Sequence, residues 1–232
     1  MQKWTEIING MKSDVEKLHN GKDFYKGSNS LLVDGLLEKA SMLKDWYSTN
    51  PQGDDRYKRI LNMPVIACDI DEVLCDWLGA WRDYWNITDV PTTWFFDRQI
   101  LSRFSEMRLD DELDQFYLSL KPLINPKEIP FEPCCYITSR PVSSQVSEQW
   151  LDMHGFPQRP VYTTDPENDI TKVSLCKENG VELFVDDRYE NWRDLNNAGI
   201  TCYLLTQPHN ERYDVGHLRI NNLKELVERW KH

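Results

Sequence analysis

The chain has 232 residues, of which 40% are hydrophobic and 28% charged, and its formal net charge at pH 7 is -11. This length and composition are ordinary for a globular protein with one sizeable core. An acidic chain without a basic stripe repels polyanions, so long nucleic acid is excluded as the expected partner, whereas a small anionic substrate is still permitted because a bound divalent cation can reverse the local potential.

The cysteines and histidines give no sign of a disulfide framework or a zinc site. The six cysteines show no paired metal-ligand spacing and stand mostly in or beside apolar runs, which predicts reduced, buried thiols. The five histidines lack HxH and HExxH spacing. His209 follows the last predicted strand and could approach its end, but an ordinary loop position is favoured.

The first residues lack the continuous apolar segment of a secretion signal. No later stretch approaches the ~18 apolar residues that are needed to cross a bilayer. We therefore expect a cytoplasmic location and no membrane partner.

Residues 1–60 are predicted to form a separate helical extension. Apolar residues recur at helical spacing in two runs, Trp4 to Leu18 and Leu32 to Trp46, with the turn-prone segment HNGKDFYKGSNS between them. This helical hairpin could pack on the rest of the chain, pair with another subunit in a homodimer, or bind a different partner. Packing on the chain's own core comes first among these alternatives.

From residue 64 onward, short apolar strands alternate with helical segments. The strands are predicted in PVIACDID, CCYITS, RPVYTT, VELFVDD and GITCYLLT. The segments SSQVSEQWLDMHG and KVSLCKENG are predicted helices that end at Gly155 and Gly180. Because each strand is an almost unbroken apolar run, the pattern predicts an α/β fold with a Rossmann-like parallel sheet covered on both faces. Residues 61–76 and 134–232 would form this core.

Residues 77–133 separate the first two strands and are predicted to form a small helical cap inserted after the first strand. This insert is far more aromatic than the rest of the chain, and most of its rings are interpreted as fillers of a small core. A few are expected to line a lid over the strand ends and to stack on a planar substrate group, with Trp77, Trp94, Phe95 and Phe96 as the candidates.

The strongest functional signal is CDIDEVLCD at the end of the first strand. Two aspartates one residue apart can reach the same site where a strand ends and turns. Asp69 is the candidate nucleophile, since a carboxylate can attack phosphorus. Asp71 would protonate the leaving oxygen and then activate water. By itself, a DxD segment is weak evidence.

Other polar residues end or follow the neighbouring strands. Thr138, Ser139 and Arg140 offer a hydroxyl group, backbone N–H groups and a guanidinium group to phosphate oxygens. Lys172, at the start of a predicted helix, can bridge the nucleophile and the phosphate, and its position favours it over Lys177. Ligands of parallel sheets bind beyond the carboxyl ends of the strands, so the fold would gather these groups at one edge.

Asp186 and Asp187 end the strand ELFVDD. Two charges at the end of an apolar strand need compensation. A hard cation with oxygen ligands supplies it.

Together these segments resemble the haloacid dehalogenase superfamily of phosphohydrolases. The resemblance covers residues 64 to about 231 and rests on DxDxV at Asp69 to Val73, Thr138, Lys172, and the pair Asp186 and Asp187. Within the superfamily, the position of the insert and the segments WFFD, TSRP, FVDDR and GITCYLLTQPHN are similar to the 5'(3')-deoxyribonucleotidases and their phage and bacterial relatives.

The resemblance implies a Mg²⁺ ion held by the Asp69 carboxylate, the Asp71 carbonyl oxygen and one carboxylate of the Asp186 and Asp187 pair, with the other ordering water or Lys172. Mg²⁺ also suits an octahedral oxygen site next to phosphate. The implied activity is hydrolysis of nucleoside monophosphates, 5'- or 3'-deoxyribonucleotides, through an aspartyl-phosphate.

Two alternatives stay open at this point. The same chemistry could act on another small phosphate monoester, such as a sugar or cofactor phosphate, or on a nucleic-acid 3' end. The chain could also be a non-catalytic protein that senses nucleotides and binds a partner through its helical hairpin. A nucleotide-dependent kinase is not expected, because the sequence has no glycine-rich phosphate loop.

Overall fold

The computed structural model describes residues 64–89, 91–94 and 97–229 of the chain. The predicted helical extension at residues 1–60 lies outside the described residues, as do Phe95 and Phe96 of the predicted lid. None of the helices within the described ranges is long and apolar enough to cross a membrane.

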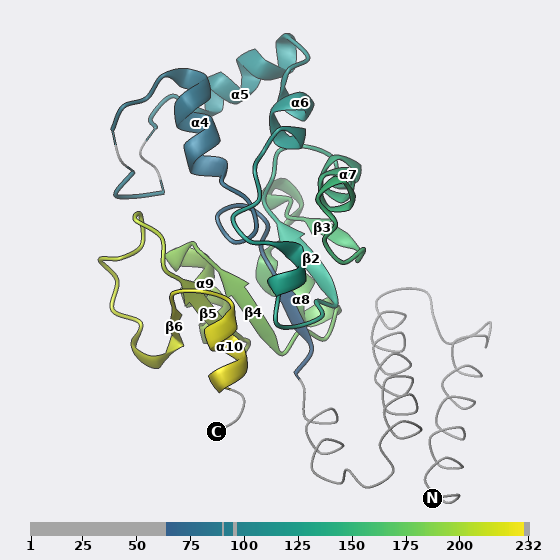
Figure 1. The fold of residues 1–232 in the computed structure, drawn as a ribbon, viewed down its shortest axis with the longest axis vertical. Coiled ribbons are helices and arrows are strands. Elements are labelled where there is room, and N and C mark those ends of the chain that lie inside the picture. The colour runs from purple at the N-terminus through teal and green to yellow at the C-terminus, as the bar shows by residue number, and fades with distance from the viewer. Residues whose placement is uncertain (1–63, 90, 95–96, 230–232) are drawn as a thin grey trace, which may run out of the picture. The chain divides into compact units, whose positions relative to one another are not determined.

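A parallel sheet forms the centre of the structure. Its strands are β1 (Ile66–Cys68), β2 (Cys135–Thr138), β3 (Val161–Thr163), β4 (Leu183–Asp186), β5 (Thr201–Leu205) and β6 (Arg219–Ile220). They follow the order β3-β2-β1-β4-β5-β6, and each neighbouring pair runs parallel. This helix-flanked sheet confirms the predicted α/β, Rossmann-like fold (Figure 1). The five predicted strands are present, each shorter than its apolar run.

Strand β6 is the one strand of the described sheet that the sequence did not predict. It has two residues, and it pairs in parallel with the end of β5. Ile220 is buried, whereas Arg219 is partly exposed. So short an edge strand contains neither an apolar run nor an alternation that sequence patterns could detect.

Helices occupy the connections between the strands, and a last helix follows β6. They are α4 (Trp77–Trp85), α5 (Ile100–Leu109), α6 (Leu113–Leu118), α7 (Ser144–His154), α8 (Lys172–Glu178), α9 (Tyr189–Asn197) and α10 (Lys224–Arg229), with short 3-10 helices η1 (Pro126–Glu128), η2 (Pro166–Asn168) and η3 (Gly216–Leu218). The described part of the insert at residues 77–133 therefore contains three α-helices, and Figure 1 shows α4, α5 and α6 together beyond the end of β1 that leads into α4.

Side chains that alternate along the strands feed two hydrophobic clusters. In β1, Ile66 and Cys68 belong to one cluster and Ala67 belongs to the other. The first cluster includes buried residues of α4, α6, α7 and α10, and the second includes buried residues of α8 and α9. Helices thus cover both faces of the sheet, which explains why the strands read as almost unbroken apolar runs.

Strand β1 lies in the middle of the sheet, between β2 and β4. The chain adds β2 and β3 on one side of β1 and then crosses over to place β4 on the other side, so the strand order reverses at β1. Crevices at such reversals, beyond the carboxyl ends of the strands, are the usual ligand sites of open α/β sheets. The backbone N–H of Asp69 donates to the carbonyl of Val185 at 3.0 Å and joins the ends of β1 and β4.

Local sequence sets two helix ends in this region. Helix α4 begins after Asp76, whose carboxylate caps it by accepting a hydrogen bond from the N–H of Gly79 at 2.7 Å. A Cβ atom at position 79 would lie 2.3 Å from Asp76 Oδ2, so a larger residue there would displace the capping carboxylate. Helix α7 ends before Gly155, which adopts φ 76° in the left-handed region, as the sequence predicted.

Candidate active site

Three aspartates at two strand ends form a buried acidic group. Asp69 directly follows β1, Asp186 is the last residue of β4, and Asp187 comes next in the chain. Each offers a carboxylate oxygen, and these oxygens lie within 4.8 Å of one another. Such a group could hold a metal ion, and its donor atoms are the hard oxygens that Mg²⁺ and Ca²⁺ prefer.

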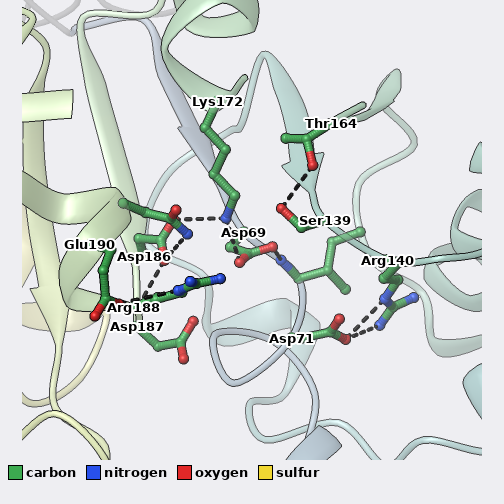
Figure 2. A network of polar contacts seen from close by, with 12 residues as sticks. Asp69, Asp71, Ser139, Arg140, Thr164, Lys172, Asp186, Asp187, Arg188 and Glu190 are labelled. Atoms are coloured by element: carbon green, nitrogen blue, oxygen red, sulfur yellow. Dashed lines mark hydrogen bonds and ion pairs between the residues drawn. The ribbon is translucent and has the colours of Figure 1, made fainter. Parts of the chain in front are cut away.

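Lys172, the first residue of α8, places its ammonium group between two of these carboxylates (Figure 2). Its Nζ donates hydrogen bonds to Asp69 Oδ2 at 2.5 Å and to Asp186 Oδ2 at 2.7 Å. Burial alone would lower the pKa of Lys172, but the negative charges of Asp186 and Asp69 outweigh it and raise the pKa above its usual value. The lysine therefore stays protonated within the acidic group.

The acidic group carries more negative charge than Lys172 neutralises. Burial, together with the charges of Asp186 and Asp187, raises the pKa of Asp69 to about 7 against the opposing effect of Lys172. Burial also raises the pKa of Asp187, whose buried Oδ2 receives no well-aligned hydrogen bond from the described residues. A divalent cation would offset both penalties, so these residues fit a hard cation such as Mg²⁺.

The other oxygen of Asp186 is fixed by the start of α9. Asp186 Oδ1 accepts hydrogen bonds from the backbone N–H of Arg188 at 2.9 Å and from Asn191 Nδ2 at 3.1 Å. With Lys172 on Oδ2, both oxygens of this fully buried carboxylate have donors. The side chain is therefore held in one orientation at the end of β4.

His209 is a site residue that the sequence interpretation did not select. Its Nε2 lies 2.8 Å from Asp187 Oδ2, and the side chain is 2% exposed. The interpretation favoured an ordinary loop position. The usable signal was its place directly after β5, on a loop that starts from the same edge of the sheet as the acidic group.

Asp71 lies in a different environment from Asp69. Arg140 donates two hydrogen bonds to Asp71 Oδ1, from Nε at 2.9 Å and from Nη2 at 2.7 Å, and the thiol of Cys75 donates to the same oxygen at 3.2 Å. Figure 2 shows this pair on the opposite side of Asp69 from Asp186. Within the described part of the chain, the hydrogen bonds to this carboxylate all go to Oδ1 and none goes to Oδ2.

The guanidinium group of Arg140 is enclosed by the insert and by α7. It lies over the ring of Tyr117 in α6 at 5.0 Å and over the ring of Trp150 in α7 at 5.5 Å, and Nη1 donates to Ser147 Oγ at 3.3 Å. The sequence assigned Arg140 to phosphate oxygens, but the structure places its side chain in a buried ion pair with Asp71. The segments that meet here are distant in sequence, which is why the pattern could not show this contact.

Thr138 and Ser139 stand at the carboxyl end of β2, as the sequence predicted. Thr138 is fully buried, and its Oγ1 has no hydrogen-bond partner among the described residues. Ser139 is exposed, and its Oγ accepts a hydrogen bond from Thr164 Oγ1 at 2.9 Å (Figure 2). The unpartnered hydroxyl of Thr138 thus ends β2, the strand next to β1, and the exposed hydroxyl of Ser139 follows it.

The predicted lid aromatics have different surroundings. Trp77 is buried in the insert, where it stacks on Trp81 at 5.0 Å and donates from Nε1 to the Tyr117 hydroxyl at 3.2 Å. It is therefore a core filler of the insert. Trp94 is partly buried, 5.6 Å from the ring of Trp77, and its edge-to-face contact with His209 at 5.3 Å brings it next to the acidic group.

Glu72 stands between Asp71 and Val73 in the DxDxV segment. It is a second residue that the sequence interpretation did not single out. It adopts φ 56° in the left-handed region, and its buried carboxylate accepts a hydrogen bond from the N–H of Leu78 in α4 at 2.7 Å. Burial raises its pKa to about 8. The strained backbone and the buried carboxyl are visible only in three dimensions, so the sequence offered no signal for them.

Comparison of the sequence with protein-family models and with curated proteins gave no significant match. The chemistry of the site is therefore argued from its geometry. The site consists of the buried acidic group and Lys172 at the ends of β1 and β4, together with Asp71, which follows Asp69 by two residues and is held separately by Arg140.

Proposed function

We propose that this protein is a Mg²⁺-dependent phosphatase of the haloacid dehalogenase type, which hydrolyses nucleoside monophosphates through a phosphorylated Asp69. The observation that supports it best is the meeting of Asp69, Lys172 and the Asp186 and Asp187 pair, from three separate segments, at one sheet edge. A non-catalytic nucleotide sensor would need neither a second aspartate held apart nor a lysine on the first.

In the first step, a carboxylate oxygen of Asp69 attacks phosphorus while the bond from phosphorus to the leaving oxygen breaks. Asp71 enters this step with a proton on Oδ2, the oxygen that Arg140 does not contact, and gives that proton to the leaving oxygen. Lys172, bonded to Asp69 Oδ2, favours the ionised form of Asp69 that the attack requires and places a positive charge beside the phosphate oxygens.

In the second step, water attacks the phosphorus of the aspartyl-phosphate and gives its proton to Asp71. The bond between phosphorus and Asp69 breaks, inorganic phosphate leaves, and both aspartates return to their starting states. Arg140 and Cys75 contact Asp71 only at Oδ1, so Oδ2 is the oxygen that carries the transferred proton.

Asp69, Asp186, Asp187 and the carbonyl oxygen of Asp71 are the groups that would hold the cation. When bound, Mg²⁺ supplies positive charge that neutralises the phosphate oxygens during the in-line displacement. The excess negative charge of the buried acidic group is the feature of the protein that suits this ion.

The decisive variant is Asp69→Asn, which keeps the size of the side chain and removes the nucleophile. We expect Mg²⁺-dependent phosphate release from an aryl phosphate to fall at least ~10³-fold, while thermal unfolding stays cooperative. Asp152→Asn, an exposed carboxylate on α7, is the matched control and keeps full activity. Activity of Asp69→Asn within a few-fold of the wild type would remove Asp69 from the nucleophile role.

The preference for nucleotides rests on Trp94, a partly buried ring next to the acidic group through its contact with His209. An aromatic ring near the leaving group favours a planar base over an open-chain or sugar substrate. Comparing kcat/KM across deoxynucleoside monophosphates, sugar phosphates and an oligonucleotide 3'-phosphate tests this. Equal values for sugar phosphates and deoxynucleotides would contradict the nucleotide preference and leave the chemistry standing.

A further inference from the structure

The loop after β5 reaches back to Asp187 with two consecutive side chains. His209 Nε2 lies 2.8 Å from Asp187 Oδ2 and 3.2 Å from its carbonyl oxygen. Asn210 Nδ2 donates to the same carbonyl at 2.6 Å and to the carbonyl of Leu205 at 2.7 Å. Asp187 is thus held through both its main chain and its side chain.

The hydrogen atom on His209 can be assigned from its neighbours. Both atoms next to Nε2 are oxygens of Asp187 that can only accept, since the carboxylate is ionised in the cation-binding state, so Nε2 carries a proton and donates it. By angle, the hydrogen bond runs to the carbonyl oxygen, while the carboxylate oxygen is the closer contact. One N–H group therefore restrains both parts of Asp187.

The imidazole ring itself has little freedom to turn. His209 is 2% exposed, its Nδ1 is buried without a hydrogen-bond partner among the described residues, and the ring of Trp94 packs against it edge to face at 5.3 Å. A buried, unpartnered ring nitrogen costs free energy. The contact of Nε2 with Asp187 is the interaction that offsets this cost.

We propose that His209 is a positioning residue of the metal group, which fixes the orientation of the Asp187 carboxylate for the cation. This inference rests on the proposed function for the cation site and concerns cation affinity rather than the reacting atoms. A group that orients a ligand side chain typically changes metal affinity by about 10- to 100-fold when it is removed. A histidine that only filled space would leave that affinity unchanged.

Mn²⁺ is a suitable probe, because the electron paramagnetic resonance signal of the free ion reports binding without any substrate. His209→Leu keeps bulk and removes the donor, whereas His209→Gln keeps an N–H donor. We expect the Kd for Mn²⁺ to rise about tenfold in His209→Leu and to stay within about threefold of the wild type in His209→Gln.

His154→Leu is the matched control, because His154 also packs against a tryptophan, Trp150 at 4.7 Å, and has a buried ring nitrogen without a partner among the described residues. It stands at the end of α7, away from the acidic group, and its substitution should leave the Kd for Mn²⁺ unchanged. Unfolding of each variant without metal shows whether a loss of affinity reflects a loss of fold.

A double-mutant cycle shows whether His209 acts through Asp187. In an Asp187→Asn background, His209→Leu should cause little further loss of Mn²⁺ affinity, because there is no carboxylate left to orient. Full additivity of the two effects would overturn the inference, as would a folded His209→Leu protein that binds Mn²⁺ like the wild type.

Failure of the proposed function gives a different pattern. A wild-type protein that binds Mn²⁺ but releases no phosphate from any monoester would refute the phosphatase and leave the role of His209 intact if His209→Leu weakens binding. A wild-type protein that binds no Mn²⁺ refutes both. Hydrolysis with unchanged Mn²⁺ affinity in His209→Leu refutes the role of His209 alone.

Discussion

Asp69 and Asp71 are separated by a single residue, yet they lie in opposite kinds of surroundings. Asp69 shares the ammonium group of Lys172 with one other carboxylate, Asp186, and burial raises the pKa of Asp69 to about 7. Asp71 is paired with Arg140, which contacts no other carboxylate of the site. The thiol of Cys75 donates to the same oxygen of Asp71, and aromatic rings surround the guanidinium group. One region has an excess of negative charge, and the other is a matched ion pair.

This difference in surroundings is consistent with the two roles proposed for Asp69 and Asp71, nucleophile and proton carrier. A cluster with uncompensated negative charge attracts a cation, which then favours the ionised form of the nucleophile. A carboxylate with one oxygen fixed by arginine is kept in place for proton transfer through its other oxygen. In the proposed reaction, the short DxD segment can supply both roles because its neighbours come from different parts of the chain.

Asp71→Asn and Asp186→Asn are expected to separate the two regions most strongly. Asp71→Asn should lower kcat for a nucleoside monophosphate by ~10²- to 10⁴-fold and leave Mn²⁺ affinity near the wild-type value, because it removes the proton carrier but keeps the main-chain carbonyl and the acidic group. Asp186→Asn should weaken Mn²⁺ binding itself. Steady-state kinetics and Mn²⁺ titration of both variants check this, and equal losses of metal affinity would contradict the comparison.

Removal of the arginine in the matched pair should cost stability. Arg140→Met leaves Asp71 partly buried without its partner, so the free energy of unfolding should fall by about 3 kcal/mol. The combination of Arg140→Met with Asp71→Asn should recover part of that loss. Lys224→Met, which breaks the exposed pair with Glu128, should cost at most about 1 kcal/mol in the same denaturant titration.

Cation binding should stabilise the folded protein through the acidic region. At a Mg²⁺ concentration of about 100 times the Kd, the free energy of unfolding should rise by about 2.7 kcal/mol. Asp186→Asn should lose this increase, whereas Arg140→Met should retain it, since it leaves the acidic group intact. Thermal unfolding with Mg²⁺ and with a chelator provides the measurement, and a Mg²⁺ effect that survives in Asp186→Asn would place the ion elsewhere.

Glu72, in the segment that joins the two regions, should make the free energy of unfolding depend on pH, with a smaller effect than the changes above. Its pKa of about 8 in the folded protein exceeds its ordinary value of 4.5, so the folded state binds this proton more tightly than the unfolded state. The resulting stability is fully present below pH 4.5 and is lost as the pH rises through about 8. One such group changes the free energy of unfolding by at most about 1.4 kcal/mol per pH unit.

Glu72→Gln keeps an acceptor for the N–H of Leu78 without the titration. Metal-free Glu72→Gln should therefore lose less stability than the wild type between pH 5 and pH 8. Glu148→Gln, an exposed position on α7, controls for the removal of one carboxylate. Parallel pH profiles for the wild type and Glu72→Gln would show that Glu72 is ionised in the folded protein throughout this range.

The sequence predicted the acidic region more completely than it predicted the ion pair of Arg140 with Asp71. Unbroken apolar runs predicted a parallel sheet, and strand ends in such a sheet share an edge, so the meeting of Asp69 with Asp186 and Asp187 followed from the pattern. The contact of Arg140 with Asp71 depends on how the turn after β2 bends. No periodicity encodes that bend.

His209 and Trp77 show two further limits of the sequence interpretation, each with a different cause. A loop that returns to the site has no periodic pattern, and the position of His209 shortly after β5 was too weak a signal, so His209 was interpreted as an ordinary loop residue although it contacts Asp187. Trp77 begins an amphipathic helix. Apolar residues at helical spacing in such a helix more often pack in the protein core than face a ligand. The burial of Trp77 against Trp81 follows that rule.

The most direct test of the account is to look for phosphate bound covalently to Asp69. An aryl phosphate has a good leaving group, so Asp71→Asn should still transfer phosphate to the protein and then hydrolyse the acyl-phosphate slowly. After an acid quench, mass spectrometry of the peptide that contains Asp69 should show one phosphoryl group in Asp71→Asn and none in the Asp69→Asn protein. Phosphate release from the aryl ester in wild type and Asp71→Asn, without any phosphorylated peptide in either, would contradict the nucleophilic role of Asp69.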